Sequence, residues 1–238
     1  MNTVEARRDL AAALRYTARL GLHEGIANHY SLAVSDDGRR FLMNPYGRHW
    51  SLMRASDLLE LDADVETATG GDVDPTAMAI HGALHRNIPR ARCVMHLHSR
   101  YATALASLKD PVMKPIDQNT MRFFNRVAVD DGFDGMGLGA EAERLATCLG
   151  NRSILLMGQH GILVVGASVA QCFDDIYYFE RAAETYITAL STGAELNVAT
   201  DEVAEKTARQ WEDYPGFADK HLAAIRDILD LQEPEYRA

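Results

Sequence analysis

Apolar residues recur at helical spacing in long segments of this chain and gather in short runs elsewhere. The helical period predicts helices over residues 3–20, 74–85, 99–108, 141–149, 168–190, 200–212 and 217–231. Short apolar runs bounded by turn residues predict strands over 30–34, 40–43, 58–61, 93–98, 126–129, 153–157 and 162–165. The rest of 109–138 has no regular period, and the tail from Gln232 is expected to be loose.

The order of these elements predicts the fold class. Hairpins join most of the early strands, whereas helices are interleaved with the later ones. This order is typical of an α/β fold with a mixed, largely antiparallel sheet and helices on its faces. No linker divides the chain, so we expect one domain over 1–238, in which 200–238 forms a C-terminal helical extension.

A metal site is indicated by histidines at the ends of predicted strands. Successive strand residues alternate faces, so His96 and His98 lie on one face about 7 Å apart. His160 also ends a strand and is followed by a glycine. Three such imidazoles with open coordination positions fit a catalytic metal, although a bare His-x-His also fits two half-buried histidines. His81 and His85, one helical turn apart, fit either metal binding or hydrogen bonding in helix packing.

Composition and charge narrow the partners and the compartment. The 238-residue chain carries a net charge of -10, which excludes nucleic acid and anionic membrane as its main partners. Its three cysteines lack motif spacing, which indicates a reducing compartment. The first twenty residues carry acidic and basic side chains and no signal-peptide pattern, so the sequence predicts a cytoplasmic protein.

Five short motifs together resemble the class II aldolase and adducin family over residues 5–192. They are Gly25-Ile26-Ala27-Asn28-x-x-Ser31, Asn44-Pro45-Tyr46-Gly47, Pro75-Thr76-x-x-x-x-His81, Val94-Met95-His96-x-His98 and Gln159-His160-Gly161. The resemblance implies a three-layer α/β/α sandwich, and a homotetramer with active sites between subunits that act on a small molecule. It also implies one divalent ion per subunit, usually zinc, held by the equivalents of His96, His98 and His160. Imidazoles also accept manganese, iron or cobalt.

Two departures from the family pattern bear on the reaction. Family aldolases carry a glutamate that ligates the resting metal and moves protons, and Ala77 stands at that position here. The common aldol mechanism therefore cannot run unchanged. Tyr46 and Pro75 replace small hydroxyl residues that bind phosphate in sugar-phosphate members, while Asn28 and Thr76 remain. We therefore expect a pocket that is not tuned to a phosphate.

Residues inside and outside the motifs suggest the substrate site. Tyr46, Phe123, Phe124 and Arg122 suggest a larger, aromatic or carboxylated compound, although core packing equally explains the two phenylalanines. We expect substrate binding by Asn28, Ser31, Asn44, Gly47, Thr76 and Arg122. The catalytic proton could come from His29 or Tyr46, from another acid, or from water. His29 is of most interest because an imidazole can titrate near neutral pH.

Three functions remain open at this stage. The first is a metal-dependent carbon–carbon lyase, of decarboxylase or retro-aldol type, acting on a non-phosphorylated keto or hydroxy acid. The second is an iron-dependent oxygenase, because three histidines with open positions suit iron and dioxygen. The third is a non-catalytic, adducin-like assembly module, which the loss of the glutamate permits. Retention of all three histidines argues against this last function.

Overall fold

One mixed sheet forms the centre of the protein, whose computed structural model describes residues 3–65, 72–135 and 140–238. In these residues seven strands lie in the order β3-β2-β1-β4-β7-β6-β5. The strands are β1 (His29–Ala33), β2 (Arg40–Met43), β3 (Leu59–Asp62), β4 (Cys93–Leu97), β5 (Val127–Asp130), β6 (Ile154–Met157) and β7 (Gly161–Gly166). β5 and β6 pair in parallel, and every other neighbouring pair is antiparallel. The predicted mixed, largely antiparallel sheet is therefore confirmed.

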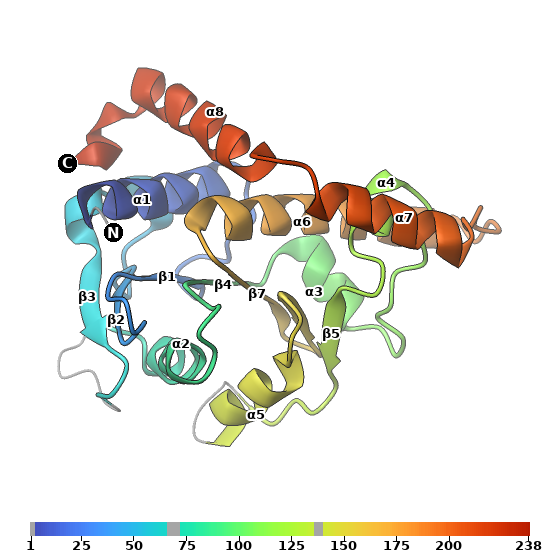
Figure 1. Cartoon of the computed structure of the whole chain (residues 1–238), viewed down its shortest axis with the longest axis horizontal. Coiled ribbons are helices and arrows are strands. Elements are labelled where there is room, and N and C mark those ends of the chain that lie inside the picture. The colour runs from blue at the N-terminus through green and yellow to red at the C-terminus, as the bar shows by residue number, and fades with distance from the viewer. Residues whose placement is uncertain (1–2, 66–71, 136–139) are drawn as a thin grey trace.

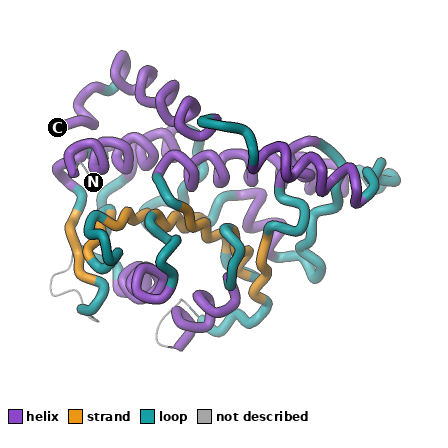
Figure 2. Tube along the Cα trace, viewed as in Figure 1, coloured by secondary structure: helices purple, strands orange, loops and turns teal. Residues whose placement is uncertain are grey.

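Helices cover both faces of the sheet, which makes a three-layer α/β/α sandwich (Figures 1 and 2). α1 (Thr3–Arg19) and α6 (Val169–Ser191) lie on one face, and α8 (Phe217–Gln232) packs outside them. α2 (Pro75–Asn87) and α5 (Ala140–Leu149) lie on the other face. Three further helices are α3 (Arg100–Ala106), α4 (Gln118–Arg122) and α7 (Asp201–Glu212). Part of 200–238 joins the main core, since Leu222, Ile225 and Leu229 of α8 belong to it.

The side chains of β4 alternate between the two helical layers. Cys93, Met95 and Leu97 pack in the apolar core beneath α1 and α6, whereas Val94 packs in the core beneath α2 and α5. Alternation places His96 on the same side as Val94. On β1, which pairs with β4, His29 lies directly opposite His96. The face covered by α2 and α5 therefore holds the imidazoles.

α2 begins at a strong cap and presents two histidines to the sheet. The Asp74 carboxylate accepts hydrogen bonds from the N–H groups of Thr76 (2.8 Å) and Ala77 (3.4 Å), and Pro75 opens the first turn. His81 and His85 are buried. Ala77 is 1% exposed and packs in an apolar cluster with Ala33, Phe41, Met43, Ala63 and Met78. The position that holds an acid in family aldolases is thus filled here by apolar packing.

Two expectations about irregular segments need correction. The segment 109–138 contains a short helix, α4, capped by Asp117, whose side chain accepts from the N–H of Thr120 at 2.8 Å. The C-terminal tail is not loose: Tyr236 is fully buried in a 3₁₀ turn (Pro234–Arg237). The nearly buried guanidinium of Arg15 holds the tail by pairing with Glu233 (2.9 Å) and Glu235 (2.8 Å).

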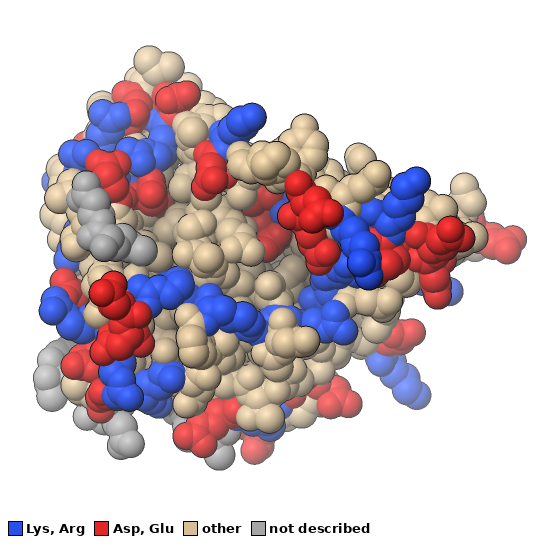
Figure 3. Space-filling view, viewed as in Figure 1, with Lys and Arg blue, Asp and Glu red and all other residues tan. Residues whose placement is uncertain are grey.

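Charged side chains of both signs lie on the face of the molecule drawn in Figure 3. On the face drawn in Figure 3, acidic clusters lie beside the basic side chains, so no single broad basic surface covers it. None of the helices in the described part of the chain is long and apolar enough to cross a membrane.

Candidate metal centre

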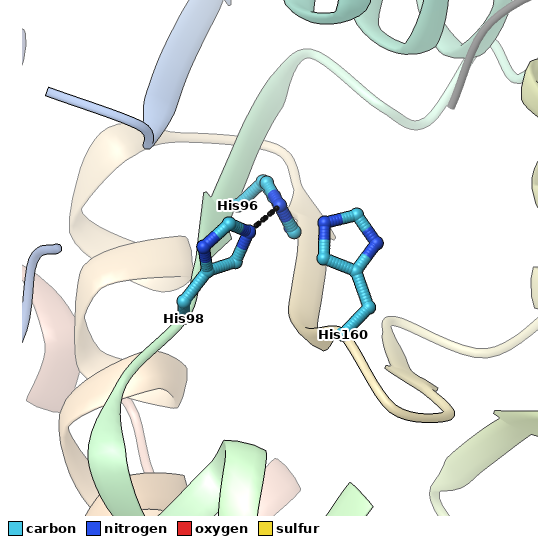
Figure 4. A group of neighbouring side chains, drawn as sticks. All are labelled: His96, His98 and His160. Carbon is cyan, nitrogen blue, oxygen red and sulfur yellow. Dashed lines mark hydrogen bonds between the residues drawn. The ribbon is translucent and has the colours of Figure 1, made fainter. Parts of the chain in front are cut away.

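His96, His98 and His160 come together at one end of β4 and form the histidine triad. His96 lies in β4, His98 follows directly after it, and His160 lies in the turn that joins β6 to β7. Their ligand atoms all lie within 4.8 Å of one another. Figure 4 shows the three rings turned toward a common centre. The convergence predicted from the sequence is therefore present.

Two members of the histidine triad are held from outside by hydrogen-bond acceptors. The Nδ1 of His96 lies 3.0 Å from the backbone carbonyl oxygen of Ile162. The Nδ1 of His98 lies 2.6 Å from a carboxylate oxygen of Glu24. A carbonyl or carboxylate only accepts, so each Nδ1 donates, and each neutral ring keeps an unprotonated Nε2. Unprotonated Nε2 atoms are what a metal ion requires.

The facing nitrogens of His96 and His98 indicate a cation between them. Their Nε2 atoms are 3.0 Å apart, and both rings already donate through Nδ1. Two lone pairs at that distance repel unless positive charge lies between them. His160 brings a third imidazole to the same place, and its own Nδ1 is buried without a hydrogen-bond partner among the described residues. Three neutral nitrogen donors at one point fit a divalent transition metal.

Burial keeps His96 and His160 in the neutral form that a metal needs. Desolvation lowers the pKa of His160 to about 4, with a smaller contribution from His98. Desolvation, together with the neighbouring imidazoles, also lowers the pKa of His96 well below its ordinary value. At neutral pH these two rings are therefore unprotonated before any ion binds.

Glu180 fixes the chain that leaves His98. Its buried carboxylate on α6 accepts hydrogen bonds from the Ser99 hydroxyl (2.7 Å) and from the N–H groups of Tyr101 (2.8 Å) and Ala102 (3.0 Å). These groups belong to the cap and first turn of α3, directly after His98. The long helix thus anchors the segment that carries a metal ligand, and the carboxylate compensates three buried donors.

A second set of imidazoles lies beside the triad and forms the histidine–serine chain, which consists of His29, His81, Ser31 and His85. The His29 Nδ1 lies 2.7 Å from His81 Nε2, and the Ser31 hydroxyl oxygen lies 2.5 Å from His81 Nδ1. The same oxygen lies 2.7 Å from His85 Nε2, and His85 Nδ1 lies 2.8 Å from the carbonyl oxygen of Ala91. His81 and His85 are therefore hydrogen-bonding residues of helix packing, one of the two interpretations left open above.

His29 contacts the triad, but it does not behave as a group that titrates near neutral pH. Its ring centroid lies 4.8 Å from that of His96. Burial lowers its pKa to about 3, and this effect outweighs the opposing influence of Asp74. The expectation of titration near neutral pH is therefore not met, because the ring is almost sealed from water. Its position beside the triad keeps a role in catalysis open as a prediction.

Three of the residues expected to bind substrate lie in or beside β1. Ser31 is fully buried beneath α2 with its hydroxyl shared between two histidines, and its role toward a substrate stays a prediction. The Asn44 side chain accepts from the N–H of Tyr30 at 2.8 Å and serves the scaffold. Asn28 is 3% exposed, and its side-chain NH₂ has no partner among the described residues. Among these three, Asn28 alone keeps an unused donor, and its substrate role also stays a prediction.

Tyr46 in the Asn44–Gly47 turn is exposed, whereas Thr76 at the start of α2 forms a local hydrogen bond within the helix cap. Tyr46 is 49% exposed, and its N–H donates to the carbonyl oxygen of Asp72 at 2.7 Å. Gly47 adopts a φ of 81°, which suits glycine in this turn. The Thr76 hydroxyl donates to the capping carboxylate of Asp74 at 2.7 Å. Their roles toward a substrate stay predictions.

Arg122 lies in a different region from the histidine triad, and its role in substrate binding stays a prediction. Its guanidinium pairs with Asp174 (2.6 Å) and Asp175 (2.8 Å) of α6 and packs over the ring of Trp211. It lines a cleft of about 680 Å³ between α4, α6 and α7, whose lining includes no member of the histidine triad. Phe123, 5% exposed, packs against Phe179 in the core.

Sequence reasoning missed Glu24 and Glu180. Glu24 lies just before the glycine of the first family motif, and an acid beside that motif was the available signal. Glu180 adjoins Phe179 in the buried stripe of the long helix, where an acid needs buried partners. Phe133 was missed too: it is 45% exposed and its ring lies 6.2 Å from that of His160, at the rim of the site.

The contact between Glu24 and His98 leads to a first prediction. Glu24→Gln keeps the shape but removes the charge that makes the His98 ring a stronger donor to metal. We expect the affinity for Zn²⁺ to fall by about 10–100-fold, measured by competition with a chromophoric chelator. Glu202→Gln, an exposed acid on α7, is the matched control and should leave the affinity unchanged. Equal affinities in both variants would show that Glu24 does not support the site.

The buried position of His85 leads to a second prediction, about acid stability. Burial lowers its pKa to about 4, while an unfolded histidine titrates near about 6.5. Between these values the unfolded chain takes up a proton that the folded chain does not, so stability is lost as pH falls. His85 alone should cost about 2 kcal/mol between pH 7 and 5, read from urea unfolding of metal-free protein. His85→Gln should reduce this slope, and an unchanged slope would contradict the assignment.

Comparison with known proteins adds independent findings. The model of the family described as "Class II Aldolase and Adducin N-terminal domain" matches residues 8–187. A putative aldolase class 2 protein of Caulobacter vibrioides is 32% identical over 209 residues, covering 87% of this chain and 80% of the other. Decarboxylase NovR of Streptomyces niveus is 28% identical over 243 residues, covering 93% and 86%. The crystal structure of an aldolase II superfamily protein from Pseudomonas syringae superposes with a TM-score of 0.89 at 32% identity, covering 99% and 96%.

Proposed function

The chain belongs to the class II aldolase and adducin family, and on that premise we propose that it is a metal-dependent carbon–carbon lyase. The substrate class we propose is a non-phosphorylated keto or hydroxy acid. The observation that carries this proposal is the histidine triad, in which the Nε2 atoms of His96 and His98 lie 3.0 Å apart with a third imidazole beside them. An assembly module has no need of so costly an arrangement of buried polar groups.

Decarboxylation is the version that the surroundings of Ala77 support. Ala77 lies in an apolar cluster, so no carboxylate occupies the place from which family aldolases move a proton. A divalent ion, when bound, acts as a Lewis acid that stabilises negative charge on a substrate oxygen. Loss of CO₂ from an acid with a carbonyl β to its carboxylate would leave such charge on that carbonyl oxygen, without prior removal of a hydroxyl proton. The similarity to a protein named as a decarboxylase agrees with this choice.

The residues of this chain would orient the substrate around the histidine triad. His96, His98 and His160 leave open positions for substrate oxygens, and Asn28 offers an unused NH₂ donor in the loop beside Glu24. His29 faces His96 across the strand pair and is the proposed catalytic neighbour. Tyr46, which is exposed in the Asn44–Gly47 turn, is the second candidate for moving a proton.

We also propose zinc as the resident ion, a cytoplasmic location and a homotetramer with active sites between subunits. Neutral imidazole donors support zinc, and three free cysteines support a reducing compartment. Ile26, Tyr46 and Phe133 support a covered site, since each is an apolar side chain between 42% and 49% exposed. Light scattering of the purified protein tests the oligomer, and metal analysis after purification in metal-free buffer tests the ion.

A turnover assay tests the proposed function. Protein loaded in turn with Zn²⁺, Mn²⁺ and anaerobic Fe²⁺ is incubated with aromatic and aliphatic keto and hydroxy acids, and CO₂ and aldehyde are measured. We expect metal-dependent release of CO₂ or of a carbonyl fragment from at least one acid. Oxygen uptake with Fe²⁺ alone would favour the oxygenase. Full metal loading without turnover of any acid would contradict the lyase.

A further inference from the structure

The histidine–serine chain has a direction that is set at one end. The Ala91 carbonyl oxygen can only accept, so the His85 Nδ1 at 2.8 Å must carry a proton. The neutral His85 ring then has an unprotonated Nε2, which accepts from the Ser31 hydroxyl at 2.7 Å. The Ser31 hydroxyl donates its one proton to His85, so its oxygen accepts from His81 Nδ1 at 2.5 Å.

The same rule carries the direction to His29. With its proton on Nδ1, the neutral His81 ring has an unprotonated Nε2, which accepts from His29 Nδ1 at 2.7 Å. All three rings are buried, and burial disfavours a charged imidazole. The remaining nitrogen of His29, Nε2, has no partner among the described residues. It is also not among the fully buried unpaired atoms.

We infer that the histidine–serine chain is a tautomer lock, which holds the proton of His29 on Nδ1 and presents the Nε2 lone pair beside the histidine triad as a hydrogen-bond acceptor. His81, Ser31 and His85 are therefore positioning residues. They act through His29, whose ring centroid lies 4.8 Å from that of His96. The tautomer of His29 is set before a ligand binds, so no proton has to move between its ring nitrogens when the ligand arrives.

The last acceptor of the histidine–serine chain distinguishes a tautomer lock from a proton-conducting wire. A wire must pass its last proton to water or to a group that can release it. Here the last acceptor is the carbonyl of Ala91, which belongs to a buried residue and cannot pass a proton on. Ser31, at the centre, is also fully buried. The chain can therefore fix where protons lie but cannot exchange them with solvent.

The lock also narrows the substrate class, a step that rests on the proposed function. An acceptor beside the metal position favours a ligand that brings a donor. A hydroxy acid supplies a hydroxyl proton to Nε2, whereas a keto acid places a second acceptor against it. A site built to accept from a hydroxyl discriminates against analogues that lack one. We therefore expect hydroxy acids to bind in preference to keto acids of the same carbon skeleton.

Histidine tautomers can be measured directly, without any activity. The metal-free protein labelled with ¹⁵N-histidine is examined by long-range ¹H–¹⁵N correlation, and His29 is assigned by the loss of its signals in His29→Gln. We expect the Nδ1–H tautomer for His29, His81 and His85. A protonated Nε2 on His29 in the wild-type protein would overturn the inference, whatever the variants do.

A matched pair of variants tests whether Ser31 transmits the direction. Ser31→Ala removes the central hydroxyl, so we expect mixed tautomers at His81 and His29. Thr17→Val removes another fully buried hydroxyl, which contacts Tyr30 at 3.0 Å and lies outside the chain. It should leave the His29 tautomer unchanged. An unchanged His29 tautomer in folded Ser31→Ala would also overturn the lock.

Ligand binding tests the substrate class separately. Lactate and pyruvate, which share a carbon skeleton, are titrated into the Zn²⁺-loaded protein by calorimetry. We expect wild type to prefer lactate by about tenfold, and Ser31→Ala to lose most of that preference. Equal binding of both acids with the correct tautomer would reject the substrate class and leave the lock. Absence of lyase turnover with the correct tautomer would reject the proposed function alone.

Discussion

Replacing His96 with alanine should reduce bound divalent metal from about one ion per chain to nearly none. His96 is 1% exposed in β4, and its ring is aimed by the Ile162 carbonyl on β7, so water does not readily take its place. Removing a direct ligand should cost more than the about 10–100-fold attributed to outer partners. Metal analysis of protein dialysed against Zn²⁺ and then against metal-free buffer measures the effect.

The control for this experiment is a histidine outside the triad. His49 is exposed beside the 3₁₀ turn Trp50–Leu52, and His49→Ala should keep its metal. Circular dichroism checks that the His96 variant stays folded, and lyase activity should disappear with the ion. Unchanged metal content in His96→Ala would remove the triad from the mechanism. The adducin-like assembly module would then become the better interpretation.

The local elements and the triad could be predicted because both depend on short-range sequence patterns. The strand period of two places His96 and His98 on one face whatever the tertiary arrangement. The Asp74-Pro75 pair gives the start of α2, and the structure begins that helix at Pro75. His160 was found because a motif, rather than a period, marked it. Patterns of this kind involve only a few residues that are close together in the sequence.

The surroundings of Ser31, Arg122 and the C-terminal tail depend on which elements meet in space. Ser31 is a strand residue near a binding loop by sequence, yet α2 covers it and uses its hydroxyl. Arg122 precedes two aromatics, but the carboxylates of α6 draw it away from the triad. The tail from Gln232 is polar, and its order comes from the buried Arg15 on the first helix. Periodicity in one segment carries no information about such distant partners.

Gly161 depends on both short-range sequence and tertiary packing. The glycine is part of a sequence motif, but a glycine is needed there because β7 and β4 approach closely. A Cβ added there would clash with the carbonyl oxygen of Leu97 and would lie 3.1 Å from the His98 ring. Both neighbours belong to the end of β4 that carries the triad. β7 can thus bring His160 to the other two histidines because residue 161 has no side chain.

Gly161→Ala should therefore damage stability and metal binding together. The clash is with backbone rather than with the flexible end of a side chain, so β7 must move away from β4 at the triad. We expect a loss of about 1–3 kcal/mol in unfolding free energy, read from urea unfolding of the metal-free protein. We also expect a fall in Zn²⁺ affinity of at least about tenfold, because a shift of His160 opens the set of three donors.

Gly82→Ala is the matched control for this substitution. Its added Cβ would meet the flexible end of Arg86 at 3.3 Å, and the nearest backbone atom, the Ala63 carbonyl oxygen, lies at 3.6 Å. Because alanine also favours a helix interior over glycine, stability should stay equal or rise, with unchanged metal affinity. If Gly161→Ala matched this control in both measurements, β4 and β7 would accommodate the added methyl group without moving apart. The triad would then not depend on their close approach.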